Sequence, residues 1–388
     1  MDIFSTWKIH EPFNLISMNF IRFILPPYYN RPSQMPFYSL ITGMTALLLM
    51  GNYPLYSQEP TYAERLGFPA GKRVLIMHVD DAGMSWDSNE GTIRSIRDGV
   101  ANSCSVMMPC PWVPDMVRYI RENPEVDAGL HLTLTSEWKK YRWGPLMGKP
   151  AVPGLVDEEG ALWRSVAQVV KNASPDEVEV EIRAQLDRAL TMGFEPTHLD
   201  SHMGTLFADV EFLQRYIKVG VEYQIPVMFP GGHISFLKED YRQKSKEELQ
   251  RQGKYVEGME IPLPDILKYV PLFGKQIWDS GLPVLDDLHN VSGWYIPEDM
   301  ERSDAVLQKY YTDKYIETIG QLEPGLTMVI MHCTKPSEIF SEISGSGDRR
   351  RADMLAMEDP RLRKYLEDEG IILTTWREVM ERRKNVSD

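Results

Sequence analysis

Two adjacent aspartates, Asp80 and Asp81, end the apolar segment VLIMHVDDAG and are the first residues of this sequence that could do chemistry. Two carboxylates side by side repel each other, so a partly buried pair requires a nearby positive charge. The chain has 8 histidines, and four of them lie at or near the ends of predicted strands: His131, His198, His202 and His332. A divalent cation bound by Asp81 and two imidazoles would offset the repulsion.

Each of these features also has an ordinary structural explanation. A histidine on a strand is usually a hydrogen-bonded core residue, and adjacent aspartates commonly form a turn or cap a helix. In THLDSH, the period-two spacing places His198, Asp200 and His202 on one face of a strand, which could equally be a polar interior face. The occurrence of all these features at the same end of successive strands favours a metal site. His78, which lies two residues before Asp80 and deeper in the strand, is expected to be structural.

The elements that must position these residues alternate between strands and helices. Strands are predicted at 74–79, 102–108, 127–135, 197–202, 226–229, 326–332 and 371–375. Helices are predicted at 89–98, 114–122, 174–193, 210–221, 305–319, 353–367 and after 375. This alternation predicts a parallel α/β sheet, open or closed into a barrel, in which ligands bind at the carboxyl ends of the strands.

Two segments differ in character from this alternating body at 72–385. Residues 231–300 are rich in proline and lack a strong period, so they are interpreted as an insertion or lid. Phe37–Gly51 is an uncharged and mostly apolar run, typical of a secretory signal within residues 1–58. An uncleaved membrane anchor is the alternative, and either interpretation predicts a protein exported to the periplasm or the extracellular space. Residues 59–71 are expected to be a linker.

The composition excludes one class of partner. The 388 residues carry a formal net charge of −14, which argues against a nucleic-acid-binding protein because such proteins need a basic surface. Cys104 and Cys110 could form a disulfide after export, and the sequence leaves this open. Cys333 follows His332 on a strand, so the two side chains point to opposite faces and should not form a catalytic pair.

Several motifs, in this order, resemble those of the YdjC-like carbohydrate deacetylases, the family of chitooligosaccharide deacetylase. They are HVDDAGMSWDSNEG, GLHLTLT, PTHLDSHMG, a late strand ending in MHC, and R-x-DML-x-M-x-DP. The similarity runs from about Arg73 to Thr375, apart from the middle insertion. Two positions depart from the family pattern: Gly204 stands where many members have a second histidine, and VMFPGGH stands where members often have an arginine.

The resemblance implies a distorted (β/α) barrel of mostly parallel strands that hydrolyses N-acetyl groups of amino sugars. The implied metal ligands are Asp81, His131 and His202, with Asp80 as the base and His332 as the acid. A site of one carboxylate and two imidazoles suits one divalent ion, either Zn, Co, Mg or Mn, and leaves positions open for water and substrate. Four further residues are expected to support the ligands or to contact the sugar: His198, Asp200, Asp287 and Trp294.

Two other functions remain open from the residues themselves. Asp80, Asp81 and Asp200 could serve a metal-independent glycoside hydrolase, which needs a pair of carboxylates. A non-catalytic carbohydrate-binding protein could retain the same cleft without turnover. Chelator sensitivity distinguishes the first alternative from the deacetylase, and acetate release distinguishes the second. The sequence specifies neither the sugar nor the oligomeric state.

Overall fold

A single parallel sheet organises the residues that the computed structural model describes, 59–290 and 293–386. The strand order is β4-β3-β2-β1-β6-β5, and β7 pairs with the beginning of β1. The strands are β1 (Arg73–Ala82), β2 (Ser103–Val106), β3 (Ala128–Leu132), β4 (Leu199–Ser201), β5 (Asp287–His289), β6 (Gly325–Met331) and β7 (Ile372–Leu373). Every residue of β1 after Arg73 is buried, as expected for a strand covered on both faces.

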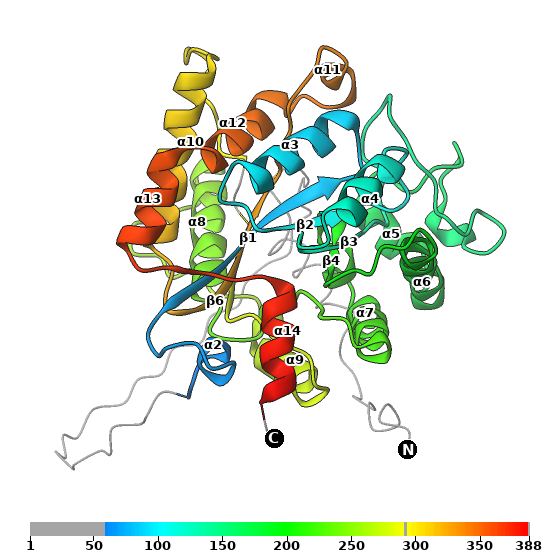
Figure 1. The fold of residues 1–388 in the computed structure, drawn as a ribbon, viewed down its shortest axis with the longest axis horizontal. Coiled ribbons are helices and arrows are strands. Elements are labelled where there is room, and N and C mark those ends of the chain that lie inside the picture. Colours follow the sequence, from blue (N-terminus) through cyan, green and yellow to red (C-terminus); the bar gives the residue numbers. More distant parts are fainter. Residues whose placement is uncertain (1–58, 291–292, 387–388) are drawn as a thin grey trace.

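Helices surround this sheet (Figure 1). The α-helices are α2 (Tyr62–Arg65), α3 (Trp86–Arg97), α4 (Val113–Glu122), α5 (Val166–Asn172), α6 (Pro175–Thr191), α7 (Val210–Tyr223), α8 (Ser235–Arg251), α9 (Val270–Asp279), α10 (Asp304–Gly320), α11 (Phe340–Ile343), α12 (Gly347–Met357), α13 (Pro360–Asp368) and α14 (Trp376–Asn385). Short 3₁₀ helices are η2 (Pro153–Leu155), η3 (His202–Phe207) and η4 (Asp265–Tyr269). Helix α12 packs between α3 and α10, and α6 packs on α7.

The two edges of the sheet are joined by the short segment 226–232. Leu199 of β4 accepts a hydrogen bond from the Met228 N–H and donates to Pro226, so this segment lies beside β4. Its other side contacts Leu285, two residues before β5, because the N–H of Leu285 donates to Phe229 and the N–H of Gly231 donates to Leu285. Isolated parallel bridges of this segment thus link the two edges of a curled sheet, and the predicted distorted (β/α) barrel is confirmed.

The local sequence explains where the helices begin. Ser174 and Glu177 form a reciprocal capping box at the start of α6, where a helix was predicted from residue 174, and Pro175 occupies its first turn. Ser85 caps α3, which begins at Trp86 rather than Asn89. The predicted helix at 353–367 is instead two helices, α12 and α13. Asp359 separates them by accepting the Arg361 N–H as an N-cap, and Pro360 follows it.

Residues 231–300 form part of the barrel as well as its periphery. They include β5, which pairs with β6 in parallel from Asp287–Thr327 to His289–Val329. They also include α8, which packs on β5, and α9. The barrel thus continues through the range that the sequence analysis treated as an insertion or lid.

The N-terminal segment before β1 is packed against the barrel. The predicted linker at 59–71 contains α2, and Tyr62, Ala63, Leu66 and Phe68 are buried. The Asp286 carboxylate accepts hydrogen bonds from the N–H groups of Tyr62 and Ala63, at 2.7 and 2.9 Å. The predicted signal peptide or anchor in residues 1–58 lies outside the described residues. Within those described, no helix has both the length and the apolar character that a membrane crossing requires.

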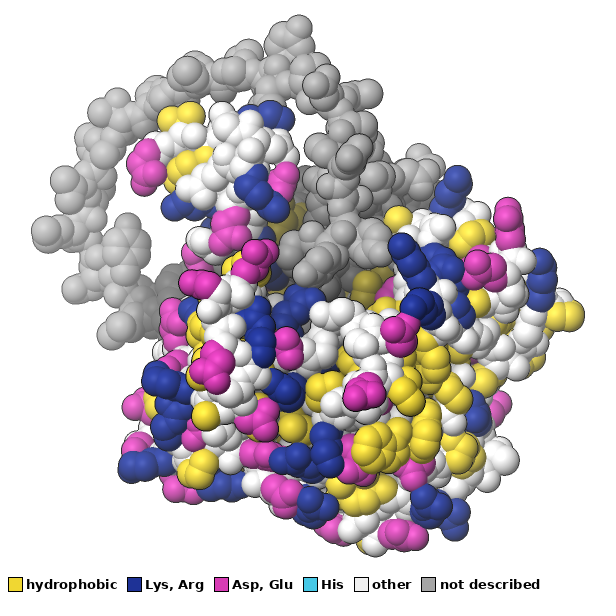
Figure 2. All heavy atoms as spheres, turned by 90° about the horizontal axis from the view of Figure 1, so that it is seen from above, with side chains coloured by type: hydrophobic (Ala, Val, Ile, Leu, Met, Phe, Trp, Pro, Cys, Tyr) yellow, Lys and Arg dark blue, Asp and Glu magenta, His cyan; other side chains and the backbone are white. Residues whose placement is uncertain are grey.

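The surface and the cysteines add two observations. Seen from above, acidic and basic side chains are interspersed over the visible face (Figure 2). Cys104, Cys110 and Cys333 are buried free thiols, so Cys104 and Cys110 are not joined. Burial raises the pKa of all three thiols, which disfavours the reactive thiolate form.

Candidate active site

Asp80 and Asp81 project toward the same group of side chains although they are neighbours on β1. Regular strands alternate their side chains between faces. Here the register between β1 and β2 shifts between Val79 and Ala82, and Asp81 has a left-handed φ of 67°. Both carboxylates consequently face His131: Asp80 Oδ2 lies 3.8 Å and Asp81 Oδ1 lies 3.4 Å from its Nε2. A left-handed non-glycine residue costs about 1–3 kcal/mol, and such strain is concentrated at functional sites.

Asp81, His131 and His202 come together at the carboxyl ends of β1, β3 and β4. Asp81 Oδ1 lies 3.4 Å from His131 Nε2 and 3.4 Å from His202 Nδ1. This oxygen is buried and has no hydrogen-bond partner. Two donors bound to one tetrahedral ion at about 2.1 Å are about 3.4 Å apart. The three side chains therefore fit a divalent cation both in donor type and in spacing.

His131 is held in the tautomer that a metal ligand needs. The parallel register places it opposite Asp200, and its Nδ1 lies 2.7 Å from Asp200 Oδ1. Nδ1–H donates to this carboxylate, so the lone pair of Nε2 faces Asp81. Burial lowers the pKa of His131, but Asp80 and Asp200 outweigh it and raise the pKa well above its usual value. A cation at this position would take the place of a proton.

His202 has the corresponding arrangement with its ring nitrogens reversed. Its Nδ1 faces Asp81, and its Nε2 lies 3.2 Å from Glu137 Oε2. Glu137 belongs to the long loop after β3, and the sequence analysis did not select it. Burial lowers the pKa of His202, whereas Glu137 and Asp81 raise it to about 9. Each predicted imidazole ligand thus has a carboxylate on the nitrogen that faces away from Asp81.

Arg350 on α12 is the second residue that the sequence analysis missed. Its Nη1 lies 2.7 Å from Asp81 Oδ2, while its Nε donates to Ser346 Oγ at 2.9 Å. Burial raises the pKa of Asp81, but Arg350 and the two imidazoles hold it well below its usual value. Asp81 is therefore ionised, with one oxygen paired to a fixed guanidinium and the other facing the imidazoles.

His332, at the end of β6, borders the same cluster. Its Nε2 lies 3.9 Å from Asp80 Oδ2, and its backbone N–H donates to Asp353 Oδ2 at 3.3 Å. Its side chain is 30% exposed, in contrast to those of Asp81, His131 and His202. Burial lowers the pKa of His332 to about 4, opposed by Asp81 and assisted by Arg350. At neutral pH this imidazole is uncharged, so it must receive a proton before it can donate one.

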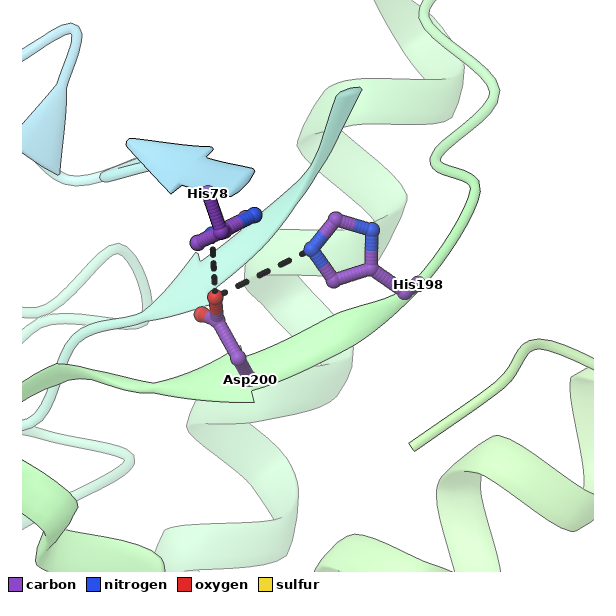
Figure 3. Close-up of side chains that lie close together, drawn as sticks. All are labelled: His78, His198 and Asp200. Carbon is purple, nitrogen blue, oxygen red and sulfur yellow. Dashed lines mark ion pairs between the residues drawn. The ribbon is translucent and has the colours of Figure 1, made fainter. Parts of the chain in front are cut away.

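The remaining predicted residues lie at three different places. His198 Nε2 is 3.8 Å from Asp200 Oδ2, as Figure 3 shows, whereas the other oxygen of Asp200 contacts His131. The ring of His198 stacks on that of Trp376. Asp287 instead accepts the N–H groups of Phe236 and Leu237 at the beginning of α8. Trp294 packs against aromatic rings of α10, those of Tyr311 and Tyr315. These contacts of Asp287 and Trp294 are with residues of α8 and α10, and not with the Asp81 cluster.

The pairing of His202 with Glu137 predicts how the stability of the metal-free protein depends on pH. Because the folded pKa of His202 is about 9, above the usual 6.5, its protonated form stabilises the fold. This contribution is complete below about pH 6.5 and is lost as pH rises through about 9. Thermal unfolding in chelator from pH 6 to 10 should show a falling midpoint.

A Glu137→Gln variant serves as the control for that measurement. Glutamine retains the size of the side chain but removes the charge that raises the pKa of His202 most strongly. The fall in midpoint between pH 6.5 and 9 should become smaller in this variant. An unchanged pH dependence would show that the His202–Glu137 pair does not titrate in this way.

The chain is similar to known proteins over most of its length. A carbohydrate deacetylase of Thermus thermophilus is 27% identical over 318 residues, which are 82% of this chain and 97% of the relative. A carbohydrate deacetylase of Brevibacillus brevis is 34% identical over 159 residues, 40% of this chain and 59% of the relative. A solved structure from Enterococcus faecalis, described as a candidate cellobiose-phosphate cleavage protein, has a TM-score of 0.56 at 20% identity. It covers 79% of this chain and 98% of its own, and it supports the fold. The model of the YdjC-like protein family matches residues 74–368, and the chain belongs to this family.

Proposed function

We propose that this protein is a metal-dependent hydrolase that removes acetyl groups from N-acetylated amino sugars or their oligosaccharides. Two kinds of observation support the proposal. The chain belongs to the YdjC-like family, and similar relatives are named carbohydrate deacetylase and chitooligosaccharide deacetylase. The observation that carries the proposal is that the imidazoles of His131 and His202 both face Oδ1 of Asp81, a buried oxygen that has no hydrogen-bond partner.

Asp81, His131 and His202 would hold the cation. A divalent ion in such a site supplies Lewis acidity, which polarises a carbonyl oxygen and lowers the pKa of water. The two imidazoles favour Zn or Co, while the carboxylate is compatible with Mn or Mg. Asp200 and Glu137 fix the ring orientations, and Arg350 holds the Asp81 carboxylate in place.

Asp80 is placed to act as the general base. Its Oδ2 lies 3.8 Å from His131 Nε2 and 3.9 Å from His332 Nε2, between a candidate ligand and the more exposed side of the site. It would accept a proton from water as the acetamide carbonyl is attacked. His332 is uncharged at neutral pH and cannot act as the acid until it is protonated. The departing amine would therefore receive the proton that Asp80 took from water, either directly or by way of His332.

The test is acetate release across a panel of N-acetylated mono- and oligosaccharides. The purified protein should release acetate, lose this activity after removal of metal by a chelator, and regain it when Zn, Co or Mn is restored. Cleavage of glycosidic bonds that resists the chelator would instead identify a carboxylate glycosidase. Sugar binding without any product in the metal-loaded protein would identify a binding protein.

Two features of the proposal do not come from the geometry of the site. Export from the cytoplasm is proposed from the apolar run Phe37–Gly51, which lies outside the described residues. A carbohydrate substrate is proposed from the names of the relatives.

A further inference from the structure

A second group of polar side chains lies one step deeper in the barrel than the candidate metal ligands. Its centre is His78 on β1, which is fully buried. The register places His78 opposite Ser103 on β2, and its Nδ1 lies 2.9 Å from Ser103 Oγ. Its Nε2 lies 3.1 Å from Ser105 Oγ. Both ring nitrogens are therefore fixed by hydroxyl groups of the neighbouring strand.

The Nε2 atom of His78 also touches two carboxylates. It lies 3.2 Å from Asp80 Oδ1 and 3.0 Å from Asp200 Oδ2, at ion-pair distance (Figure 3 shows the Asp200 contact). Asp80 is the proposed base. The other oxygen of Asp200 is 2.7 Å from Nδ1 of His131, a candidate metal ligand. A single nitrogen thus links the base to the carboxylate that orients a ligand.

The distances in this group favour a proton over a second metal ion. Two donors on one tetrahedral ion are about 3.4 Å apart, whereas His78 Nε2 and Asp200 Oδ2 are in direct contact at 3.0 Å. His198 Nε2 is farther away, at 3.8 Å from the same oxygen. Burial lowers the pKa of His78, but Asp200 and Asp80 raise it to about 9, so the ring is cationic at neutral pH.

We propose that His78 is a positioning residue for the deacetylation reaction, which holds Asp80 and Asp200 in place from below the site. This role rests on the proposed function. Without His78, Asp200 Oδ2 would lose its contact at 3.0 Å and Asp80 Oδ1 would be left with the Ser105 hydroxyl at 3.4 Å, so the repulsion between the two carboxylates would displace one or both. Displacement of Asp200 would release His131 and weaken metal binding. Displacement of Asp80 would slow the chemical step without affecting the sugar contacts.

The test compares His78→Gln with His78→Asn. The amide nitrogen of glutamine can reach the position of the imidazole Nε2 and contact both carboxylates, whereas that of asparagine reaches only the position of Nδ1. Three quantities are measured in each variant: Zn²⁺ affinity by competition with a chromogenic chelator, the thermal midpoint of the metal-free protein, and kcat and KM for acetate release.

We expect His78→Asn to lose about 10- to 100-fold in Zn²⁺ affinity, the range typical for groups that orient a metal ligand. Its kcat should fall by about 10-fold or more at a KM within about twofold of the parent value. His78→Gln should recover most of both losses at a similar thermal midpoint. The proposal is overturned if the two variants lose affinity and kcat equally, or if the losses follow only the thermal midpoint.

The metal measurement keeps this proposal separate from the proposed function. If the parent protein binds Zn²⁺ but releases no acetate from any substrate, the proposed function fails. The difference in Zn²⁺ affinity between the two variants still tests whether His78 acts through Asp200. If the parent is active and Zn²⁺ affinity is the same in all three proteins, the positioning role fails while the deacetylase remains.

Discussion

An Asp80→Asn variant should bind its metal ion normally and lose about 10²- to 10⁴-fold in kcat, the usual contribution of a general base. Asparagine has nearly the shape of aspartate but cannot accept the proton from water. Asp80 is close to the ligand cluster but farther from His131 than Asp81 is, since its Oδ2 is 3.8 Å from His131 Nε2 and Asp81 Oδ1 is 3.4 Å from the same atom. Metal content by elemental analysis and kcat by acetate release measure the two effects separately.

The result has an alternative that the structure makes specific. Asp80, His131 and Asp200 also lie close enough to hold an ion. If Asp80→Asn loses its metal, the cation occupies that neighbouring position and Asp80 is a ligand. An Asp81→Asn variant provides the comparison: it should lose metal because Asp81 Oδ1 is the oxygen that both imidazoles face.

The sequence located six of the seven strands, although not their exact ends, because the signal of a strand is local. Alternation of strands and helices, the capping box at Ser174 and the spacing of His198, Asp200 and His202 are all readable within a few residues. The rule that ligands bind at the carboxyl ends of parallel strands then brings distant histidines together. The contact of His131 with Asp200 follows from this register.

The partners of these residues were not predictable because their contacts are long-range. Arg350 is 269 positions from Asp81 and is the middle one of three consecutive arginines, so nothing local distinguishes it from Arg349 and Arg351. Glu137 comes from a loop without periodicity. The left-handed conformation of Asp81 also has no signature in the sequence, although it allows both aspartates to face His131.

The barrel strand β5 was missed for a different reason. It has only three residues and pairs with β6, while the hydrogen bonds to the irregular segment 226–232 are made by Leu285, two residues before the strand. Three residues are too few to show period two, and surrounding prolines suggested an insertion. The edges of the sheet are linked next to this strand. A sequence pattern can therefore indicate the fold class and still miss one of the short strands of the barrel.

The paired aspartates are stabilised by more than one cation. Arg350 occupies Oδ2 of Asp81 at 2.7 Å and leaves Oδ1 free. His78 occupies Oδ1 of Asp80 at 3.2 Å, leaving Oδ2 toward His131 and His332. Each carboxylate thus has one oxygen held by the protein and one directed into the site. A fixed cation on the structural side allows the other oxygen to bind a metal or accept a proton.

Replacement of either candidate imidazole ligand should have the largest effect on metal binding. His131→Ala and His202→Ala each leave Asp81 and one imidazole, a donor set too small to hold a divalent ion tightly. We expect each variant to lose more than about 100-fold in Zn²⁺ affinity, beyond the 10- to 100-fold typical of orienting residues. Elemental analysis after dialysis against a slight excess of Zn²⁺ gives the stoichiometry, and chelator competition gives the affinity.

His332→Ala is the matched control for these two variants. It also removes a histidine at the end of a barrel strand, but its Nε2 lies 3.9 Å from Asp80 Oδ2, whereas the imidazoles of His131 and His202 each lie 3.4 Å from Asp81 Oδ1. It should therefore retain one equivalent of Zn²⁺ while its kcat falls. If His131→Ala or His202→Ala also retains a full equivalent at parental affinity, the proposed ligand set is wrong. The proposed metal site has three donors, which are Asp81 Oδ1 and the two imidazoles. The proposed function therefore requires that both variants lose Zn²⁺ affinity.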